Sequence, residues 1–201
     1  LYSLAIGLIC GRWALMALGD VDYGLLGLVG GLVVFISVFN GVLAGAISRF
    51  YAFSVGAANV AEDKVGALEE CRRWFNVAVV AHSAVPLVLV LVGYPIGVFA
   101  VRHWLTIPDD RVLECVWVFR YSCISCFFAM INVPFTAMYN AKQWIAELTL
   151  YSFITATLNV FFLHYMITHP GLWLAKYAAW SCVLTVAPQV IICLRANTLK
   201  D

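Results

Sequence analysis

Hydrophobic residues occur along this chain in long runs that short polar stretches separate. Six runs are long enough to cross a membrane as helices, with edges good to a few residues. They cover residues about 1–18, 24–48, 75–101, 112–133, 146–167 and 173–194. The pattern predicts an all-α polytopic membrane protein, with residues 1–201 forming a single six-helix transmembrane bundle. Because Leu1 already lies in an apolar run, we expect the chain to be a fragment of a longer protein.

The polar stretches predict how these helices are connected. Residues Gly19 to Asp22 (GDVD) are expected to form a tight turn between the first two helices. Residues Ala61 to Arg73 are expected to form a short amphipathic helix on the membrane surface, leading into the third span. Pro86 and the sequence Gly93 to Gly97 (GYPIG) predict a bend or break in that span. Pro134 is expected to end the fourth span.

Small residues follow one side of the second span at helical spacing. This line contains two Gly-x-x-x-Gly pairs, Gly27 with Gly31 and Gly41 with Gly45. In lipid, a helix face without side chains lets a neighbouring backbone approach closely, and such packing holds helices together. We therefore predict that the second span is a central helix of the bundle. A similar stripe on the first span consists of Ser3, Gly7, Cys10, Ala14 and Ala17.

The composition supports the membrane class and excludes others. The chain is 64% hydrophobic and 11% charged, against roughly 45–50% apolar and about 25% charged residues in soluble domains. The net charge of +1 gives no field that would attract nucleic acid. The seven cysteines lie mostly in apolar runs and are interpreted as small buried hydrophobes, although Cys123 and Cys126 have a redox spacing.

Lys and Arg are unevenly shared between the two sides of the predicted bundle. Seven lie on the side that holds the 48–74 stretch, the 134–146 connection and the C-terminal tail: residues 49, 64, 72, 73, 142, 195 and 200. Three lie on the other side: residues 102, 111 and 176. The positive-inside rule therefore predicts that both termini of this segment are cytoplasmic.

Two arginines lie inside predicted spans and are the candidate binding residues. Arg12 comes seven residues before Gly19, and Arg120 nine residues after Arg111. Both are therefore roughly 10–14 Å below the outer surface. A charge in the membrane costs on the order of 2.5–3.5 kcal/mol near the centre, so it faces a partner or water, or extends its head group to the surface. Positive charge at depth without negative charge favours an anionic ligand.

Other polar residues inside the spans have two interpretations each. Asn40, Asn132 and Asn159 could form hydrogen bonds between helices or bind substrate. His82 and His164 could belong to a proton relay, but we expect hydrogen bonds between helices instead. The sequence has no metalloprotease, phosphate-loop or serine-hydrolase motif. We expect no enzymatic activity, no cofactor and no metal site.

The motifs between residues 12 and 56 resemble those of a known transporter family. Arg12, the sequence LGDVDYG at Leu18–Gly24, the glycine-rich helix and Arg49 after it resemble the start of bacterial polysaccharide flippases. Pro134 followed by Met138–Ala141 (MYNA) is similar to a connection in the same family. These O-antigen and capsule flippases belong to the MATE-like (multidrug/oligosaccharidyl-lipid/polysaccharide) superfamily.

The resemblance implies a function and a set of partners. The chain would be the N-terminal lobe of a transporter that flips lipid-linked oligosaccharide across the bacterial cytoplasmic membrane by alternating access. Its partners would be that lipid, membrane lipid, a coupling ion and the missing C-terminal bundle. Arg12 corresponds to a cationic cavity residue of the family, and Arg120 is a candidate by its depth. The alternatives are an ion-coupled multidrug exporter of the same fold, a non-transporting membrane assembly protein, or an acyltransferase using His164.

Overall fold

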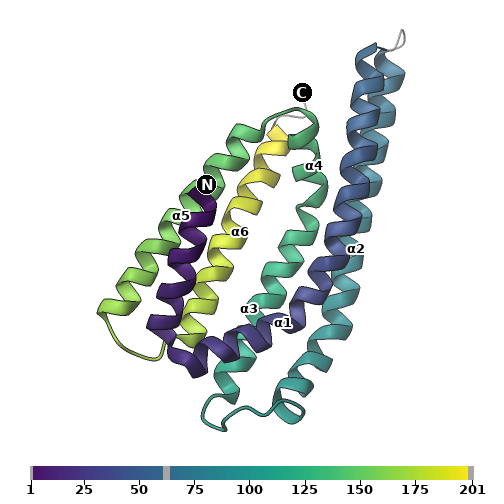
Figure 1. The fold of residues 1–201 in the computed structure, drawn as a ribbon. Coiled ribbons are helices and arrows are strands. Elements are labelled where there is room, and N and C mark those ends of the chain that lie inside the picture. Colours follow the sequence, from purple (N-terminus) through teal and green to yellow (C-terminus); the bar gives the residue numbers. More distant parts are fainter. Residues whose placement is uncertain (1, 61–63, 199–201) are drawn as a thin grey trace.

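The computed structural model describes residues 2–60 and 64–198, and all regular structure in them is helical, which confirms the predicted all-α class (Figure 1). Six helices follow one another along the chain: α1 (Tyr2–Val60), α2 (Lys64–His103), α3 (Val112–Ile131), α4 (Val133–Ala141), α5 (Ile145–Thr168) and α6 (Leu174–Thr198).

Five stretches of helix are long and apolar enough to cross a membrane, counted over the described residues. They are Leu4–Gly31, Glu69–His103, Val112–Ile131, Ile145–Thr168 and Leu174–Ala196. The chain is thus a membrane protein with five such stretches where the hydropathy pattern predicts six. The first of them runs through Gly19, so it joins parts of the first two predicted spans. The side chains of residues 34–44, including Asn40 and Gly41, lie outside the described part.

The connection between the first two predicted spans is a kink at a single residue. Gly19 has φ 77° and ψ 171°, while the residues on either side of it are helical. The predicted turn over Gly19–Asp22 is therefore wrong in extent, because Asp20 already belongs to the next helical segment. We call residues 2–18 the first arm of α1 and residues 20–60 the second arm. The second arm returns toward the opposite end of the molecule (Figure 1).

Helix α2 is longer and more regular than the sequence pattern predicts. It runs without interruption from Lys64 to His103, with Pro86 and Pro95 inside it. The described part of the predicted surface helix, from Lys64 to Arg73, is thus the start of α2. The expected break near Gly93–Gly97 does not occur. Prolines are tolerated in membrane helices because neighbouring groups satisfy the backbone carbonyl that loses its donor.

The predicted break at Pro134 is observed. Asn132 ends α3, and Pro134 stands in the first turn of α4. Proline is favoured there because the first backbone N–H groups of a helix have no partner within it. Helices α5 and α6 begin and end within a few residues of the predicted limits.

The connections gather at two ends of the molecule (Figure 1). One end, called here the kink end, holds Gly19, the loop between α2 and α3 and the connection between α5 and α6. The opposite end holds the connection between α4 and α5 and the last turn of α6. Beyond that end, the last part of α1 and the first part of α2 continue side by side. This arrangement places the predicted spans side by side between the two ends.

Three apolar clusters hold the helices together. The largest joins the second arm of α1 to α2, α3 and α6 through residues such as Val29, Val101 and Val118. A second lies around Tyr139 and joins α4 to α2 and α6. A third packs Ala14 of the first arm against Leu163 and Met166 of α5. The predicted small-residue stripe of the first arm thus meets α5, because Cys10 and Ala17 border the same cluster.

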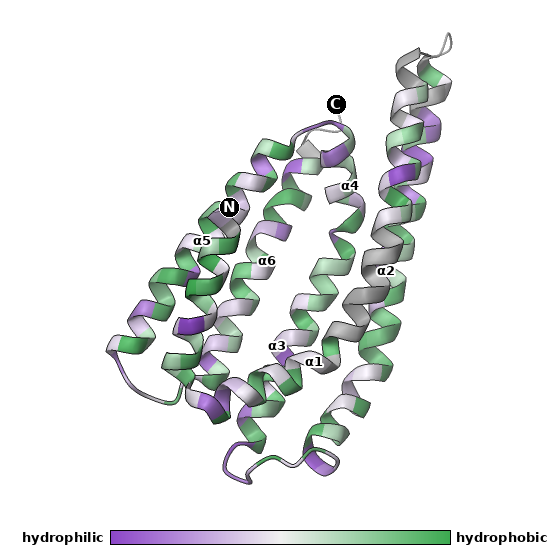
Figure 2. Ribbon diagram, viewed as in Figure 1, coloured by the Kyte–Doolittle hydropathy of each residue, from purple (hydrophilic) through white to green (hydrophobic). Residues whose placement is uncertain are grey.

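Much of the outer surface is apolar as well. Figure 2 shows hydrophobic residues along the length of the helices, with hydrophilic residues more frequent near the ends. Large side chains such as Leu91, Val80 and Phe161 are about two-thirds exposed. An apolar exterior of this extent is expected for helices whose solvent is the hydrocarbon core of a bilayer.

The glycine face of the second arm is open. A Cβ atom added at Gly24, Gly27, Gly30, Gly31 or Gly45 would have no neighbouring atom within 4 Å. The predicted close packing against this face is therefore wrong for the described part of the chain. Helix α3 packs beside the arm through Leu25, Val29 and Val33 instead. The distance between the axes of two packed helices is larger where they meet through large side chains than where they meet through glycines.

Candidate functional site

Arg12 lies on the exposed side of the first arm. Ala14, on the opposite side of the same helix, is buried against α5. Leu8 and Met16, which are one turn before and after Arg12, are 71% and 59% exposed. No hydrogen bond, ion pair or ring contact of Arg12 occurs among the described residues. The structure thus presents a guanidinium on an apolar surface, where it can bind an anionic ligand or contact the head group of a membrane lipid.

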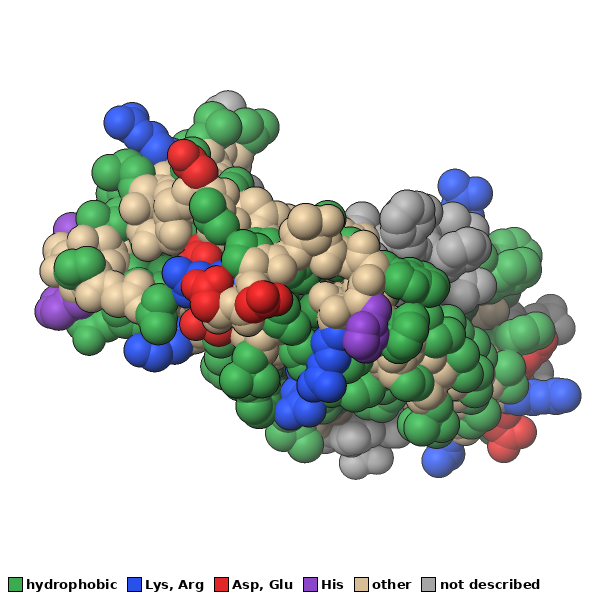
Figure 3. All heavy atoms as spheres, turned by 90° about the horizontal axis from the view of Figure 1, so that it is seen from below, with side chains coloured by type: hydrophobic (Ala, Val, Ile, Leu, Met, Phe, Trp, Pro, Cys, Tyr) green, Lys and Arg blue, Asp and Glu red, His purple; other side chains and the backbone are tan. Residues whose placement is uncertain are grey.

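An ion pair next to the kink holds the start of the second arm. Asp22, at the start of the second arm, is 7% exposed and lies 3.5 Å from Arg111 in the α2–α3 loop. Arg111 also pairs with Asp110 at 3.7 Å and with Glu114 at 3.4 Å. Figure 3, which views this end, shows the acidic side chains gathered around a basic one. The group fixes the beginning of the second arm relative to α3.

We predict that Asp22→Asn lowers the free energy of unfolding by about 1–2 kcal/mol, because Arg111 loses a buried charged partner but keeps two others. The measurement is the thermal unfolding of the purified protein in detergent. Asp20→Asn is the matched control, since Asp20 is exposed two residues away. Equal stability of the two variants would contradict a structural role for the ion pair.

Arg120 has partners within the molecule, in contrast to Arg12. Its Nε donates a hydrogen bond to the hydroxyl of Tyr94 on α2, with 3.0 Å between the two atoms. Its guanidinium carbon lies 4.5 Å from the ring centre of Trp117 and 5.9 Å from that of Tyr94. The side chain is nevertheless exposed. No described contact joins Arg12 to Arg120, so the structure places the two candidate residues at separate positions.

A groove lined by small and hydroxyl side chains lies between the second arm, α3 and α6. It has a volume of about 310 Å³. Its hydroxyl groups come from Tyr121, Ser122 and Ser125 of α3 and from Ser181 and Thr185 of α6. Gly30 of the open glycine face borders it. The small residues Ser122, Ser125 and Ala129 of α3 face this groove, and side-chain hydroxyls there can bind water or the hydroxyls of a ligand.

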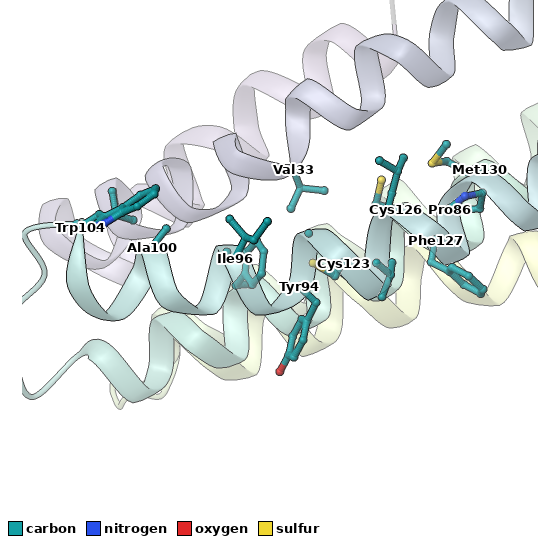
Figure 4. Close-up of a pocket in the computed structure, with 16 residues that line it drawn as sticks. Val33, Pro86, Tyr94, Ile96, Ala100, Trp104, Cys123, Cys126, Phe127 and Met130 are labelled. Carbon is teal, nitrogen blue, oxygen red and sulfur yellow. The ribbon is translucent and has the colours of Figure 1, made fainter.

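A second cavity of about 330 Å³ between α1, α2 and α3 is almost entirely apolar (Figure 4). Val33, Ile96, Cys123 and Cys126 are among its lining residues. Burial among hydrophobic groups agrees with the interpretation of these cysteines as small hydrophobes. All seven cysteines of the chain are free in the structure. The described residues contain no group of three or more side chains that could hold a metal ion.

The histidines and asparagines inside the spans have different environments. His82 is buried, but its Nδ1 meets only the carbonyl of Ala78 in its own helix, at 3.2 Å, so the hydrogen bond expected between helices is absent there. The ring of His164 lies 5.8 Å from that of Trp13. Asn132 accepts a hydrogen bond from Cys193 on α6 at 3.5 Å, which confirms an interhelical role.

The opposite end of the bundle holds a second polar group. Arg195 of α6 donates a hydrogen bond of 2.7 Å to Glu147 of α5. Burial raises the pKa of the nearby Tyr139 hydroxyl, and the charge of Glu147 raises it further, while Arg195 lowers it. Tyr139 therefore stays protonated at neutral pH. This group joins α4, α5 and α6 at one end of the bundle. It contains neither Arg12 nor Arg120.

The sequence pattern marks Arg12 and Arg120 as cations inside apolar helices but does not show what surrounds them. The partner of Arg120, Tyr94, lies in the segment interpreted only as a helix breaker. A polar face on α6 can be recognised in the sequence, because hydroxyl side chains recur at every fourth residue, at Tyr177, Ser181 and Thr185. The pairing of Asp22 with Arg111 has no such local signal. Chemically, the arrangement offers cations and hydroxyls for binding, without an activated nucleophile among the described residues.

Comparison with known proteins adds no family assignment. No family model, no curated protein and no solved structure matches this chain.

Proposed function

We propose that this chain is one six-helix lobe of a polysaccharide flippase of the MATE-like superfamily. In this proposal it moves lipid-linked oligosaccharide across the bacterial cytoplasmic membrane, together with a second bundle of the same fold. The termini of this segment lie in the cytoplasm, and alternating access comes from rocking of one bundle against the other. The protein supplies binding groups and a polar path, and no covalent chemistry is needed.

The observation that carries the proposal is the exposed guanidinium of Arg12. It lies on an apolar helix face and has no partner among the described residues. An unpaired cation at membrane depth is costly, so such residues mark ligand paths more often than structural contacts. The phosphate groups of a lipid-linked sugar would satisfy the donors of this guanidinium in a planar, two-point contact.

Two further observations support the proposal. The groove between the second arm, α3 and α6 places five hydroxyl groups on one surface, and hydroxyls suit sugar hydroxyl groups as ligands. The open glycine face provides a surface on which a second bundle could pack closely. An exporter of cationic drugs would instead need negative charge at depth. Among the described carboxylates, Asp22 lies three residues after the kink at Gly19, and Glu114 and Glu147 lie in the first turns of α3 and α5.

We predict that Arg12→Ala abolishes translocation, because the phosphate loses its charged partner. The measurement is surface polysaccharide in a flippase-deficient bacterium that expresses the full protein carrying this chain. Arg12→Lys should retain part of the activity, since it keeps the charge but loses the two-point contact. The matched control is Arg73→Ala, an exposed cation on α2 far from the kink.

Normal surface polysaccharide in the Arg12→Ala strain would reject the site. Failure of the unmodified protein to restore polysaccharide, with drug resistance instead, would favour the exporter of the same fold. A tag on the protein verifies equal amounts in the membrane for every variant.

A further inference from the structure

Three arginines of α2, α3 and the loop between them differ in charge balance. Arg111 is surrounded by Asp22, Asp110 and Glu114, which offset its charge. Arg102 in the last turn of α2 and Arg120 on α3 have no carboxylate partner among the described residues. Figure 3 shows basic and histidine side chains on the kink end, bordered by hydrophobic ones. Arg102 and Arg120 therefore contribute net positive charge beside an apolar surface.

These two arginines are both exposed, Arg102 on α2 and Arg120 on α3. Arg102 follows Tyr94 by eight residues, which is about two turns of α2. Tyr94 meets Arg120 through its hydroxyl, and Figure 4 shows that this hydroxyl points away from the apolar cavity. The contact thus lies on the outside of the helix pair. Arg102 is roughly 12 Å along the helix from Tyr94, toward the kink end.

The guanidinium of Arg120 is held in place with most of its donors open. Its Nε is used by Tyr94, and Trp117 stacks on it. An arginine has five N–H donors, so several remain available for a ligand. The surrounding surface suits hydrocarbon, since Leu113 is 66% and Ile124 is 39% exposed on the same helix. A cation positioned by aromatic rings beside apolar side chains is suited to a molecule that is anionic at one end and apolar at the other.

We propose that this outer surface of α2 and α3, formed by Tyr94, Trp117 and Arg120 with Arg102 nearer the kink end, binds the phosphate of an anionic phospholipid from the surrounding bilayer. The acyl chains run from there along α3 past Ile124, one turn beyond Arg120. Arg120 extends its head group toward the interface and meets the phosphate, as arginines in membrane helices do. This inference does not depend on the proposed function, and it gives Arg120 a partner other than the transported lipid.

The test compares lipid retention by native mass spectrometry of the purified full protein. The probes are phosphatidylglycerol and phosphatidylcholine, each added to the detergent at the same concentration. Wild-type protein is expected to retain phosphatidylglycerol preferentially. Arg120→Gln should weaken this retention about fivefold, the effect of one arginine near anionic lipid. Tyr94→Phe should weaken it less, because the guanidinium loses its anchor and not its charge.

Lys176→Gln is the matched control. Lys176 is exposed on α6 and stacks on Trp173 at 4.9 Å, so it is also a cation over an aromatic ring. Unchanged retention by Arg120→Gln, or equal retention of the two lipids by wild-type protein, would overturn the proposal. Loss of translocation in Arg120→Gln with unchanged phosphatidylglycerol retention would likewise overturn it and assign Arg120 to the substrate. Arg120→Lys, which keeps the charge, should retain most of the bound lipid and so separates a binding defect from misfolding.

Discussion

Replacing Gly19 by alanine is expected to lower the free energy of unfolding by about 1–3 kcal/mol, the cost of forcing a side chain into a backbone region that is essentially restricted to glycine. The φ of 77° and ψ of 171° lie in that region. Space is not the cause, because an added Cβ atom at Gly19 would meet nothing within 4 Å. The strain acts entirely on the backbone.

The consequence of this strain is a change in the direction of the first arm. If the kink relaxes toward a straight helix, Ala14 must leave Leu163 and Met166 on α5. The hydrogen bond between Tyr2 and Thr157, 3.0 Å long, must break as well. Arg12 would then move relative to the groove. Gly19→Ala should therefore reduce translocation in the assay above as well as stability.

Thermal unfolding in detergent measures the first effect, with Gly24→Ala as the matched control. Gly24 is helical and equally open, so alanine there should be neutral or slightly stabilising through its better helix propensity. A Gly19→Ala protein as stable as the Gly24→Ala protein would show that the kink does not need the glycine conformation.

Gly97→Ala is the second substitution with a large expected effect, and it acts through space. A Cβ atom at Gly97 would lie 2.0 Å from Cζ of Phe119, far inside van der Waals contact. Phe119 is 4% exposed, and its ring stacks on Tyr94 at 6.1 Å, so it must leave this contact and shift toward the adjacent apolar cavity to admit the methyl group. Overpacking of this kind costs about 1–3 kcal/mol. The α2–α3 contact should loosen, and the Tyr94–Arg120 hydrogen bond with it.

The control for this prediction is Gly93→Ala, one turn earlier on α2, where an added Cβ atom would have open space. Unfolding midpoints of the two variants should differ clearly. Combining Gly97→Ala with Phe119→Leu should restore part of the lost stability, because the smaller side chain makes room for the methyl group. Additive effects of the two substitutions would instead show that the ring is not the obstacle.

Hydropathy alone located most of the helices well, because a run of about 20 apolar residues can satisfy its backbone in lipid only as a helix. The limits of α5 and α6 and the break at Pro134 follow from such local rules. Hydropathy does not predict well where one helical segment ends and the next begins. The segments around Gly19 are separated by one residue, and α2 continues through Pro86 and Pro95 because its neighbours decide whether a proline bends the helix.

The membrane class, the helical content and the places of Arg12 and Arg120 within apolar helices follow from the order of residues. These properties depend on composition and on the helical repeat, which act over a few turns of chain. Tertiary packing had to decide which faces meet: it left the glycine face open, buried Asp22 beside Arg111 and placed Tyr94 against Arg120. Such contacts form between residues that are distant in the sequence. The periodicity within one helix does not show which residue of another helix it will contact.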